Sequence, residues 1–130
     1  MVSNVQSKLL LEAAQRYAQA ITPLALGVLD ERGISEEVAA RFQLGTITEP
    51  INGHETYEGW LSIPYITASG SCVGFMFRRL DDAKPTYGSP TGQKSHLYNV
   101  CDITLDSAYV VVCEGELDTV ITSGVLGIPA

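Results

Sequence analysis

Three carboxylates fall within five residues near the end of the chain, at Glu114, Glu116 and Asp118. They follow an unbroken apolar run over residues 108–113, which is rich in β-branched side chains. Such a run predicts a strand buried on both faces, as in a parallel sheet covered by helices. Ligands of these sheets bind just past the carboxyl ends of the strands, and carboxylate oxygens suit Mg²⁺. Glu114 and its neighbours are therefore a candidate metal site.

The same acids also fit the first turn of a helix, where negative charge complements the helix dipole. The apolar face of that helix would consist of Leu117, Val120, Ile121 and Leu126, and Gly127 would end it. An E-G-x-x-D pattern is not specific, so its spacing alone leaves both interpretations open.

The net charge of −7 by itself argues against nucleic acid as a partner, but the charge is unevenly distributed. Residues 1–60 sum to −4, residues 61–100 to +2 and residues 101–130 to −5. Half of the basic residues lie within seventeen positions, at Arg78, Arg79, Lys84 and Lys94. A basic strip beside an acidic site suits a nucleic-acid polymerase, because cations hold phosphates and carboxylates hold Mg²⁺. The alternative is a solvated hairpin end of mixed charge.

The histidines and two of the tyrosines have ordinary interpretations. His54 and His96 lie in polar contexts, which predicts surface histidines. Tyr87 and Tyr98 could stack on a base, although packing with the hydroxyl outward is the commoner use of such tyrosines. No Cys or His pair has the spacing of zinc ligands, so we expect no zinc site.

The composition predicts one compact domain in a reducing compartment. The chain of 130 residues has room for a single core, and its hydrophobic content of 45% excludes disorder. Cys72 and Cys113 lie in apolar runs, which predicts buried free thiols in a cytoplasm. No apolar stretch reaches the ~18 residues that span a bilayer, and no signal peptide is recognisable. We expect a cytoplasmic protein without a membrane partner.

The elements that must position these groups begin with three helices. Ser3 and Gln6 suit a capping box that opens a helix, and Thr22-Pro23 suits the start of a second helix that ends at Gly33. Ser35 opens a third helix. Residues 60–67 and 71–79 then predict two strands joined as a hairpin, and residues 81–91 predict a mobile loop. This order indicates an α+β fold, with a helical N-terminal region on a small mixed or antiparallel sheet.

Several stretches resemble known motifs. The apolar run, followed by E-G-E-L-D, a short helix and L-G-I-P-A, resembles the opening of a Toprim domain. Toprim is the metal-dependent module of bacterial-type primases, type IA and II topoisomerases and some nucleases. Residues 60–80 resemble the primase stretch R-I-x-F-P-I-x-D-x-x-G-x-x-x-G-F-x-x-R-x-L. Residues 87–90 resemble its K-Y-x-N-S-P, and residues 94–98 resemble its K-x-x-x-L-Y.

The resemblance continues upstream, where residues 29–34 and 41–45 resemble the primase stretches Y-L-x-x-R-G-I and F-x-I-G. It therefore covers about residues 24–130 in order, and the phage versions of bacterial-type DNA primase are the most similar. The chain departs from the pattern at Trp60, where the family has arginine, and at Thr86, where it has lysine. The later D-x-D pair and the zinc ribbon of the family are absent.

This resemblance implies a division of the chain and a function. Residues 1–107 would be the N-terminal subdomain of the primase RNA polymerase core, and residues 108–130 the first β-α unit of a Rossmann-like Toprim module, incomplete here. The intact enzyme would make RNA primers on a DNA template with Mg²⁺ or Mn²⁺. We expect this chain alone to be inactive.

The resemblance also implies roles for the site residues. Glu114 would be the general base or a metal-associated carboxylate, and Asp118 a supporting metal ligand. Phosphates of template or nucleotide would contact Arg78 and Lys94, with Arg79 and Lys84 adding positive field. The expected partners are single-stranded DNA and nucleoside triphosphates, the missing C-terminal Toprim portion or a replicative helicase, and a second copy in a homodimer.

Two other functions stay open at this stage. The chain could be a non-catalytic assembly protein that docks a partner completing the Toprim fold. It could also be a piece of a Toprim nuclease or topoisomerase, against which the motif series from Gly74 to Tyr98 argues.

Overall fold

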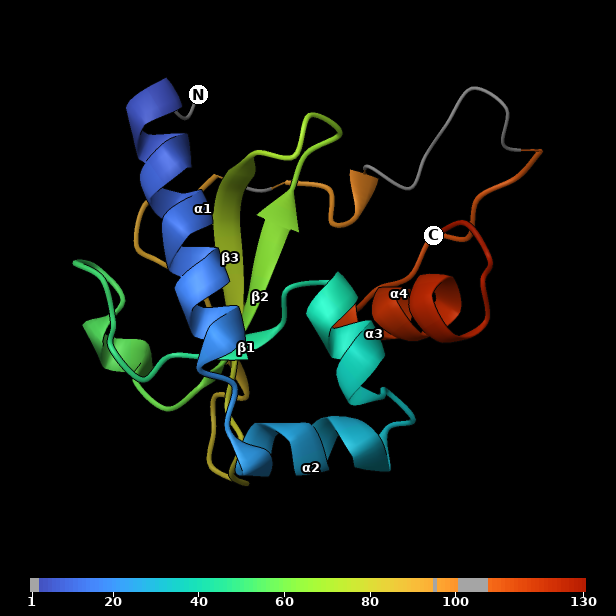
Figure 1. Cartoon of the computed structure of the whole chain (residues 1–130), viewed down its shortest axis with the longest axis horizontal. Coiled ribbons are helices and arrows are strands. Elements are labelled where there is room, and N and C mark those ends of the chain that lie inside the picture. Colours follow the sequence, from blue (N-terminus) through green and yellow to red (C-terminus); the bar gives the residue numbers. More distant parts are fainter. Residues whose placement is uncertain (1–2, 95, 101–107) are drawn as a thin grey trace.

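The structure is a computed structural model that describes residues 3–94, 96–100 and 108–130. Its sheet has four strands in the order β1-β2-β3-β4, and each neighbouring pair is antiparallel. The strands are β1 (Gly45–Thr46), β2 (Leu61–Ile66), β3 (Cys72–Arg78) and β4 (Tyr87–Gly88). The long central hairpin of β2 and β3 is the one that the sequence predicts, and the α+β class is confirmed (Figure 1).

Three N-terminal helices form where the sequence signals place them: α1 (Asn4–Gln19), α2 (Pro23–Glu31) and α3 (Glu36–Arg41). Each begins after a hydroxyl side chain that accepts a hydrogen bond from a backbone N–H of the first turn. Ser3 Oγ accepts from Gln6 N, Thr22 Oγ1 from Ala25 N and Ser35 Oγ from Val38 N, at 3.1, 3.3 and 3.2 Å. These caps satisfy N–H groups that a helix leaves unpaired, which explains why the starts were predictable.

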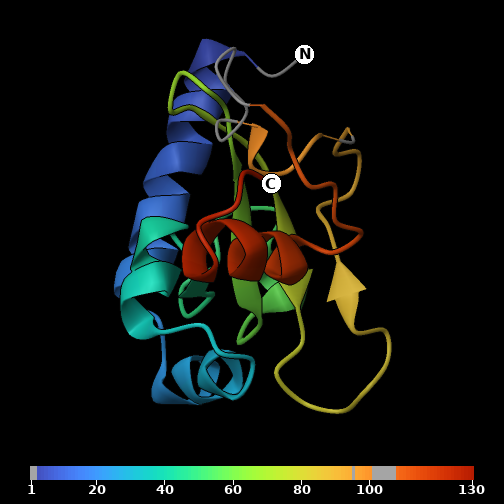
Figure 2. The same ribbon diagram turned by 90° about the vertical axis from the view of Figure 1, so that its right-hand side faces the viewer.

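Helices cover both faces of the sheet (Figures 1 and 2). On one face, Phe75 and Phe77 of β3 pack with Tyr17 of α1 in a buried cluster. On the other face, Leu61 and Ile63 of β2 pack against α3 and the C-terminal helix. This division follows from the pleat of the strands, which sends alternate side chains to opposite faces. The resulting two-layered core fixes both ends of the hairpin.

The C-terminal helix forms, although Leu126, predicted on its apolar face, is 62% exposed and follows the last helical residue. It consists of α4 (Glu116–Val120), which continues into a π-helical turn, η3 (Ile121–Val125). Leu117 and Val120 point into the core and are 2% and 0% exposed. Gly124 lies so close to α3 that a Cβ on it would stand 2.7 Å from Val38 Cγ1 and 2.8 Å from Phe42 Cε2. Close packing on α3 therefore fixes the far end of this helix.

The strand predicted over residues 108–113 is not formed. These residues have no strand pairing, and Tyr109 and Val112 are 63% and 86% exposed. A backbone hydrogen bond of 2.7 Å runs from Val111 N to Pro129 O. The prediction was wrong because a strand also needs a paired backbone beside it, and the described part of the chain supplies none there.

The structure also describes the two cysteines and the lengths of the helices, about which the sequence made predictions. Cys72 is buried, and burial raises the pKa of its thiol to about 11, so it remains a protonated thiol. Cys113 is only partly buried, contrary to expectation. The helices of the described residues are all too short or too polar to cross a bilayer.

Candidate functional site

The acidic segment lies where an extended backbone turns into α4. Gly115 caps the helix with an extended conformation, φ −109° and ψ 150°, and offers no side chain to accept from the first N–H groups. Glu114 therefore precedes the helix, whereas Glu116 and Asp118 stand in its first turn. Glu114 and Asp118 are exposed, while Leu117 between them is buried. Glu116 and Asp118 thus take the helix-start positions that the second interpretation predicts, and the metal site remains a prediction.

Glu116 is engaged by a residue that the sequence analysis did not single out. The Tyr65 hydroxyl donates a hydrogen bond of 2.7 Å to Glu116 Oε1, across from β2 to α4. Tyr65 is 7% exposed, and burial together with the Glu116 carboxylate raises the pKa of its hydroxyl. The one signal in the sequence was that tyrosine stands where the quoted primase pattern has isoleucine.

A hollow of about 220 Å³ lies beside the acidic segment. Side chains of Glu114, Glu116, His96 and Tyr98 contribute to its lining. The Tyr98 ring packs edge-on against the Tyr65 ring, with 5.5 Å between centroids, so packing is its observed role. His96 is half-buried, contrary to the predicted surface position, and its Nε2 is enclosed without a hydrogen-bond partner among the described residues.

The acidic segment is not a complete metal site by itself. Among residues 3–94, 96–100 and 108–130, no three His, Cys, Asp or Glu side chains gather closely enough to hold an ion. Two exposed carboxylates still suit Mg²⁺, which proteins often hold through one or two carboxylates plus substrate phosphates and water. Glu114 and Asp118 thus offer the oxygen donors that Mg²⁺ prefers, and nucleotide phosphates and water would have to complete its coordination.

The arginines at the end of β3 have different partners. The Arg78 guanidinium lies 5.9 Å from the centre of the Tyr87 ring, and its Nη1 donates to Arg79 O at 3.0 Å. Its Nε is enclosed and has no hydrogen-bond partner within the described residues. Tyr87 is 42% exposed on the edge strand, so this pair presents a ring and a cation together. Such a pair suits stacking with a base beside a phosphate contact.

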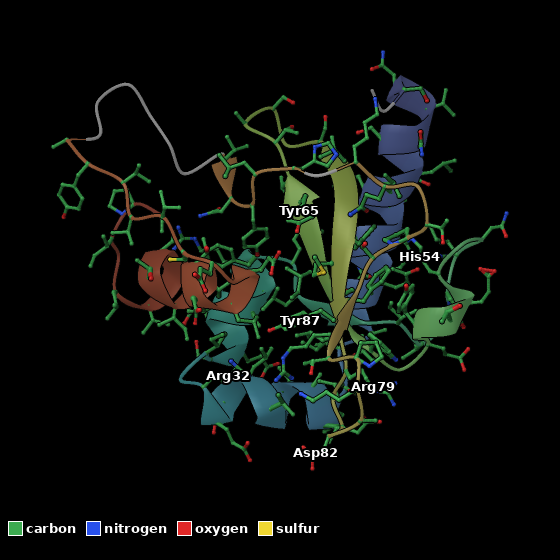
Figure 3. The ribbon with its side chains drawn as sticks, turned by 180° about the vertical axis from the view of Figure 1, so that it is seen from behind. Arg32, His54, Tyr65, Arg79, Asp82 and Tyr87 are labelled. Carbon is green, nitrogen blue, oxygen red and sulfur yellow. The ribbon has the colours of Figure 1, made fainter. Side chains whose placement is uncertain are left out.

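Arg79 is occupied by an ion pair. Its Nε and Nη2 donate to the two carboxylate oxygens of Asp81 at 2.7 and 2.9 Å, and its guanidinium lies 5.1 Å from the Trp60 ring centre. The Arg79 hydrogen bonds lower the pKa of Asp81 to about 2. Figure 3 shows Arg79 and Asp82 at the end of the sheet away from Tyr65. Arg79 therefore has less free charge for a phosphate than Arg78.

The structure does not bring all four predicted cations into one strip. Lys84 is next to this group in sequence, and its Nζ lies 3.4 Å from Thr86 Oγ1. Lys94 follows Gln93, whose carboxamide bonds both backbone groups of Phe75 at 2.7 and 2.8 Å. Phe75 and Arg78 are three residues apart on β3, which is roughly 10 Å. Lys94 therefore lies toward the other end of the strand from the arginines.

Lys94 instead lines a second hollow, of about 450 Å³, between the start of α1 and the loop that carries His54. His54 is 2% exposed, so the prediction of a surface histidine was wrong. Tyr17 Oη accepts from Ile51 N at 3.0 Å and lies 2.8 Å from His54 Nδ1. The Tyr17 proton is thus free to go to Nδ1, which leaves the His54 proton on Nε2. Burial lowers the pKa of His54 and keeps it neutral.

The acidic segment and Arg78 share one face of the sheet. The pairs Leu61↔Arg78 and Tyr65↔Gly74 place Arg78 and Tyr65 on the same side, because residues two apart along a strand face the same way. Leu61 and Tyr65 are four positions apart along β2, which amounts to roughly 13 Å. Leu61 and Ile63 on this face are buried under α3 and the C-terminal helix, so Arg78 and the Tyr65–Glu116 pair lie toward opposite ends of a covered face.

Solved structures of DnaG primases have this fold. The chain is similar to the E. coli primase catalytic core, with a TM-score of 0.68 and 23% identity over 90% of this chain and 50% of that chain. It is similar to the RNA polymerase domain of Mycobacterium tuberculosis primase DnaG in complex with double-stranded DNA, with a TM-score of 0.71 and 22% identity over 94% of this chain and 52% of that chain. A further DnaG catalytic core gives 0.67 and 20%, over 90% and 50% of the two chains. The fold is therefore primase-like, and the chain spans about half of each neighbour.

A curated relative comes from a phage. The Gene 57 protein of Mycobacterium phage D29 is 42% identical over 77 residues, which are 56% of this chain and 50% of that protein. The match thus covers about half the length of that relative. No family model matches the chain.

Proposed function

We propose that this chain supplies part of a Toprim-type DNA primase and works in template-directed synthesis of RNA primers. The observation that carries the proposal is the similarity of its fold to DnaG catalytic cores over 90–94% of the chain, with TM-scores of 0.67–0.71. The motifs that resemble primase in the same order support it. The relative in a mycobacteriophage supports a phage origin, and thus action in the cytoplasm of a bacterial host.

In this proposal residues 1–107 form the N-terminal subdomain of the polymerase core, and residues 108–130 begin the Toprim module. Glu114 and Asp118 would hold Mg²⁺ or Mn²⁺ together with nucleotide phosphates. When bound, the cation would supply neutralising charge while a 3′-hydroxyl loses its proton and attacks the α-phosphate of a nucleoside triphosphate, the α–β bond breaks and pyrophosphate leaves. Glu114 would orient the ion or accept the hydroxyl proton.

The basic residues would hold the nucleic acid. The Arg78 guanidinium lies 5.9 Å from the centre of the Tyr87 ring, which suits a template or nucleotide phosphate next to a stacked base. Lys94 would contact a phosphate farther along the strand. Arg79 and Lys84 would add positive field, and the contribution of Arg79 is reduced by its pairing with Asp81. Single-stranded DNA and nucleoside triphosphates are the proposed ligands.

A second candidate function is assembly without catalysis by this chain. It is favoured by the exposed side chains of Tyr109 and Val112, which belong to an apolar segment without strand pairing. Exposed apolar surface of this kind marks a place where another strand or chain packs. The proposed occupant is a polypeptide that carries the remaining Toprim strands; a second copy of this chain or a replicative helicase are other outcomes.

A primer-synthesis assay separates the two candidates. The purified chain, given single-stranded template, four ribonucleotides and Mg²⁺ or Mn²⁺, should make no product alone. Addition of a polypeptide that carries the downstream Toprim strands and a D-x-D pair should form a complex and restore synthesis. Glu114→Gln should abolish synthesis without preventing complex formation, whereas Glu12→Gln on the exposed side of α1 should change neither.

The possible results assign the function clearly. A complex that never makes primers, with the wild-type chain present, would favour assembly alone. Robust synthesis by the chain alone would overturn the proposed dependence on a partner. Synthesis that survives Glu114→Gln would remove Glu114 from its role.

A further inference from the structure

The first turn of α4 has little that fixes it locally. The helix has five residues before the π-helical turn, and its cap, Gly115, has no side chain to accept from the first N–H groups. A helix this short is not stable by itself, so tertiary contacts decide where it lies. Leu117 and Val120 anchor its underside in the core. Apolar anchors resist lifting of the helix but only weakly resist a small slide or rotation, because the hydrophobic effect is not directional.

The directional contact at the start of α4 is the bond from Tyr65 to Glu116. It joins a hydroxyl to a carboxylate at 2.7 Å, the short distance typical of a charge-assisted hydrogen bond. The Tyr65 ring is itself held edge-on by Tyr98, at 5.5 Å, and its backbone belongs to the central hairpin. The bond therefore ties the first turn of α4 to β2 of the central hairpin.

We propose that Tyr65 is a positioning residue for the acidic segment. Its hydroxyl holds Glu116 in a hydrogen bond with β2 and thereby sets the rotation of α4. Glu114 and Asp118 are then the two carboxylates that remain for a cation. The quoted primase pattern has isoleucine at this place, which makes the tie a feature of this chain. The inference rests on the proposed function only for the use of the cation; the tie itself is independent of it.

For Tyr65→Phe, the proposal and a simple acidic cluster predict opposite changes in divalent-cation affinity. If all three acids were equivalent ligands, Tyr65→Phe would release Glu116 and leave divalent-cation affinity equal or higher. If Tyr65 positions the segment, the same substitution removes the tie and affinity falls although no charge is lost. Loss of a group that orients a metal ligand typically lowers affinity about 10-fold or more.

The test is Mn²⁺ titration of the full chain, followed by the paramagnetic broadening of the amide signals of residues 114–119. Tyr65→Phe should raise the apparent dissociation constant about 10-fold. Glu116→Gln keeps an oxygen that can accept from Tyr65, so we expect about a twofold change or less. Glu114→Gln should nearly remove the broadening. Tyr57→Phe is the matched control, because Tyr57 also donates one hydrogen bond, of 3.0 Å, to Ser89 O elsewhere.

The tie has its own readout in hydrogen exchange without metal. Tyr65→Phe should speed amide exchange at Thr119 and Ile121, whose N–H groups bond to Gly115 O and Leu117 O, about 10-fold or more, since a hydrogen bond to a carboxylate is lost, while Tyr57→Phe should not. Unchanged exchange in Tyr65→Phe would overturn the tie. Unchanged or tighter Mn²⁺ binding in Tyr65→Phe would overturn the positioning role. No Mn²⁺ broadening in the wild-type chain, with exchange still sensitive to Tyr65, would count against the proposed metal function and leave the tie standing.

Discussion

The central hairpin and residues 108–113 are both rich in apolar side chains, yet only the hairpin buries them. Phe75 and Phe77 of β3 are 0% exposed between α1 and the sheet, whereas Val112 is 86% exposed. The difference lies in the partners: β3 pairs with β2 over its whole length, and residues 108–113 have no strand beside them among the described residues. An apolar run therefore makes a buried strand possible, but a paired backbone decides it.

The largest expected effect comes from the buried side of this comparison. Phe75→Ala removes a ring that packs on Tyr17 and Phe77, and should lower the free energy of unfolding by about 3–5 kcal/mol. Val112→Ala should change it by less than about 0.5 kcal/mol, because that side chain faces solvent. Urea unfolding followed by circular dichroism measures both. A large loss from Val112→Ala would mean that residues 108–113 are buried in solution.

A glycine pair tests how tightly α1 is held against the sheet. A Cβ on Gly45 would stand 2.2 Å from the carbonyl carbon of Tyr17, so Gly45→Ala should cost at least about 1–3 kcal/mol in unfolding free energy. Gly27, inside α2, has nothing within 4 Å of such a Cβ. Gly27→Ala should therefore stabilise the protein by about 0.5–1 kcal/mol. Equal effects of the two changes in thermal unfolding would contradict the close packing of α1 on β1.

The buried histidine predicts a pH dependence of stability. Burial holds the pKa of His54 below its unfolded value, so the unfolded chain binds more protons in this range. Stability should thus be complete above about pH 7 and fall as the pH drops below about 6.5, the ordinary histidine value. His54→Gln should flatten this slope, as measured by urea midpoints from about pH 8 to pH 5. An unchanged dependence of stability on pH in His54→Gln would mean that another group titrates in this range.

The smallest expected effects concern nucleic-acid binding. Arg78→Ala and Lys94→Ala should each weaken single-stranded DNA binding and reduce the salt slope by about 0.7. Arg79→Ala should matter less, because Asp81 already engages that guanidinium. Arg16→Ala, on α1, is the control and should have no effect. Fluorescence anisotropy at several salt concentrations measures this, and equal losses from all four variants would show that β3 has no special role.

The sequence by itself determined the elements whose signals are local. Ser3, Thr22 and Ser35 mark helix starts because a cap needs only a side chain and the next three residues. The hairpin of β2 and β3 follows from alternation and a short turn. The order of primase-like motifs also led to the correct fold, which the similarity to DnaG catalytic cores then bore out. Each of these signals either acts over a few neighbouring residues or is a motif order that can be recognised in the sequence itself.

Tertiary structure alone decided how the candidate site is arranged. Nothing near Tyr65 in sequence indicates that it would bond Glu116, fifty-one residues away. The same holds for His54. Its polar neighbours in sequence predicted a surface position, but the fold encloses it between Tyr17, Phe75 and Phe77. The four cations, close in sequence, separate because Gln93 leads Lys94 toward the far end of β3 while Arg79 turns to Asp81. Burial and pairing depend on which residues, distant in sequence, the fold brings next to a given side chain, so they are properties of the whole fold.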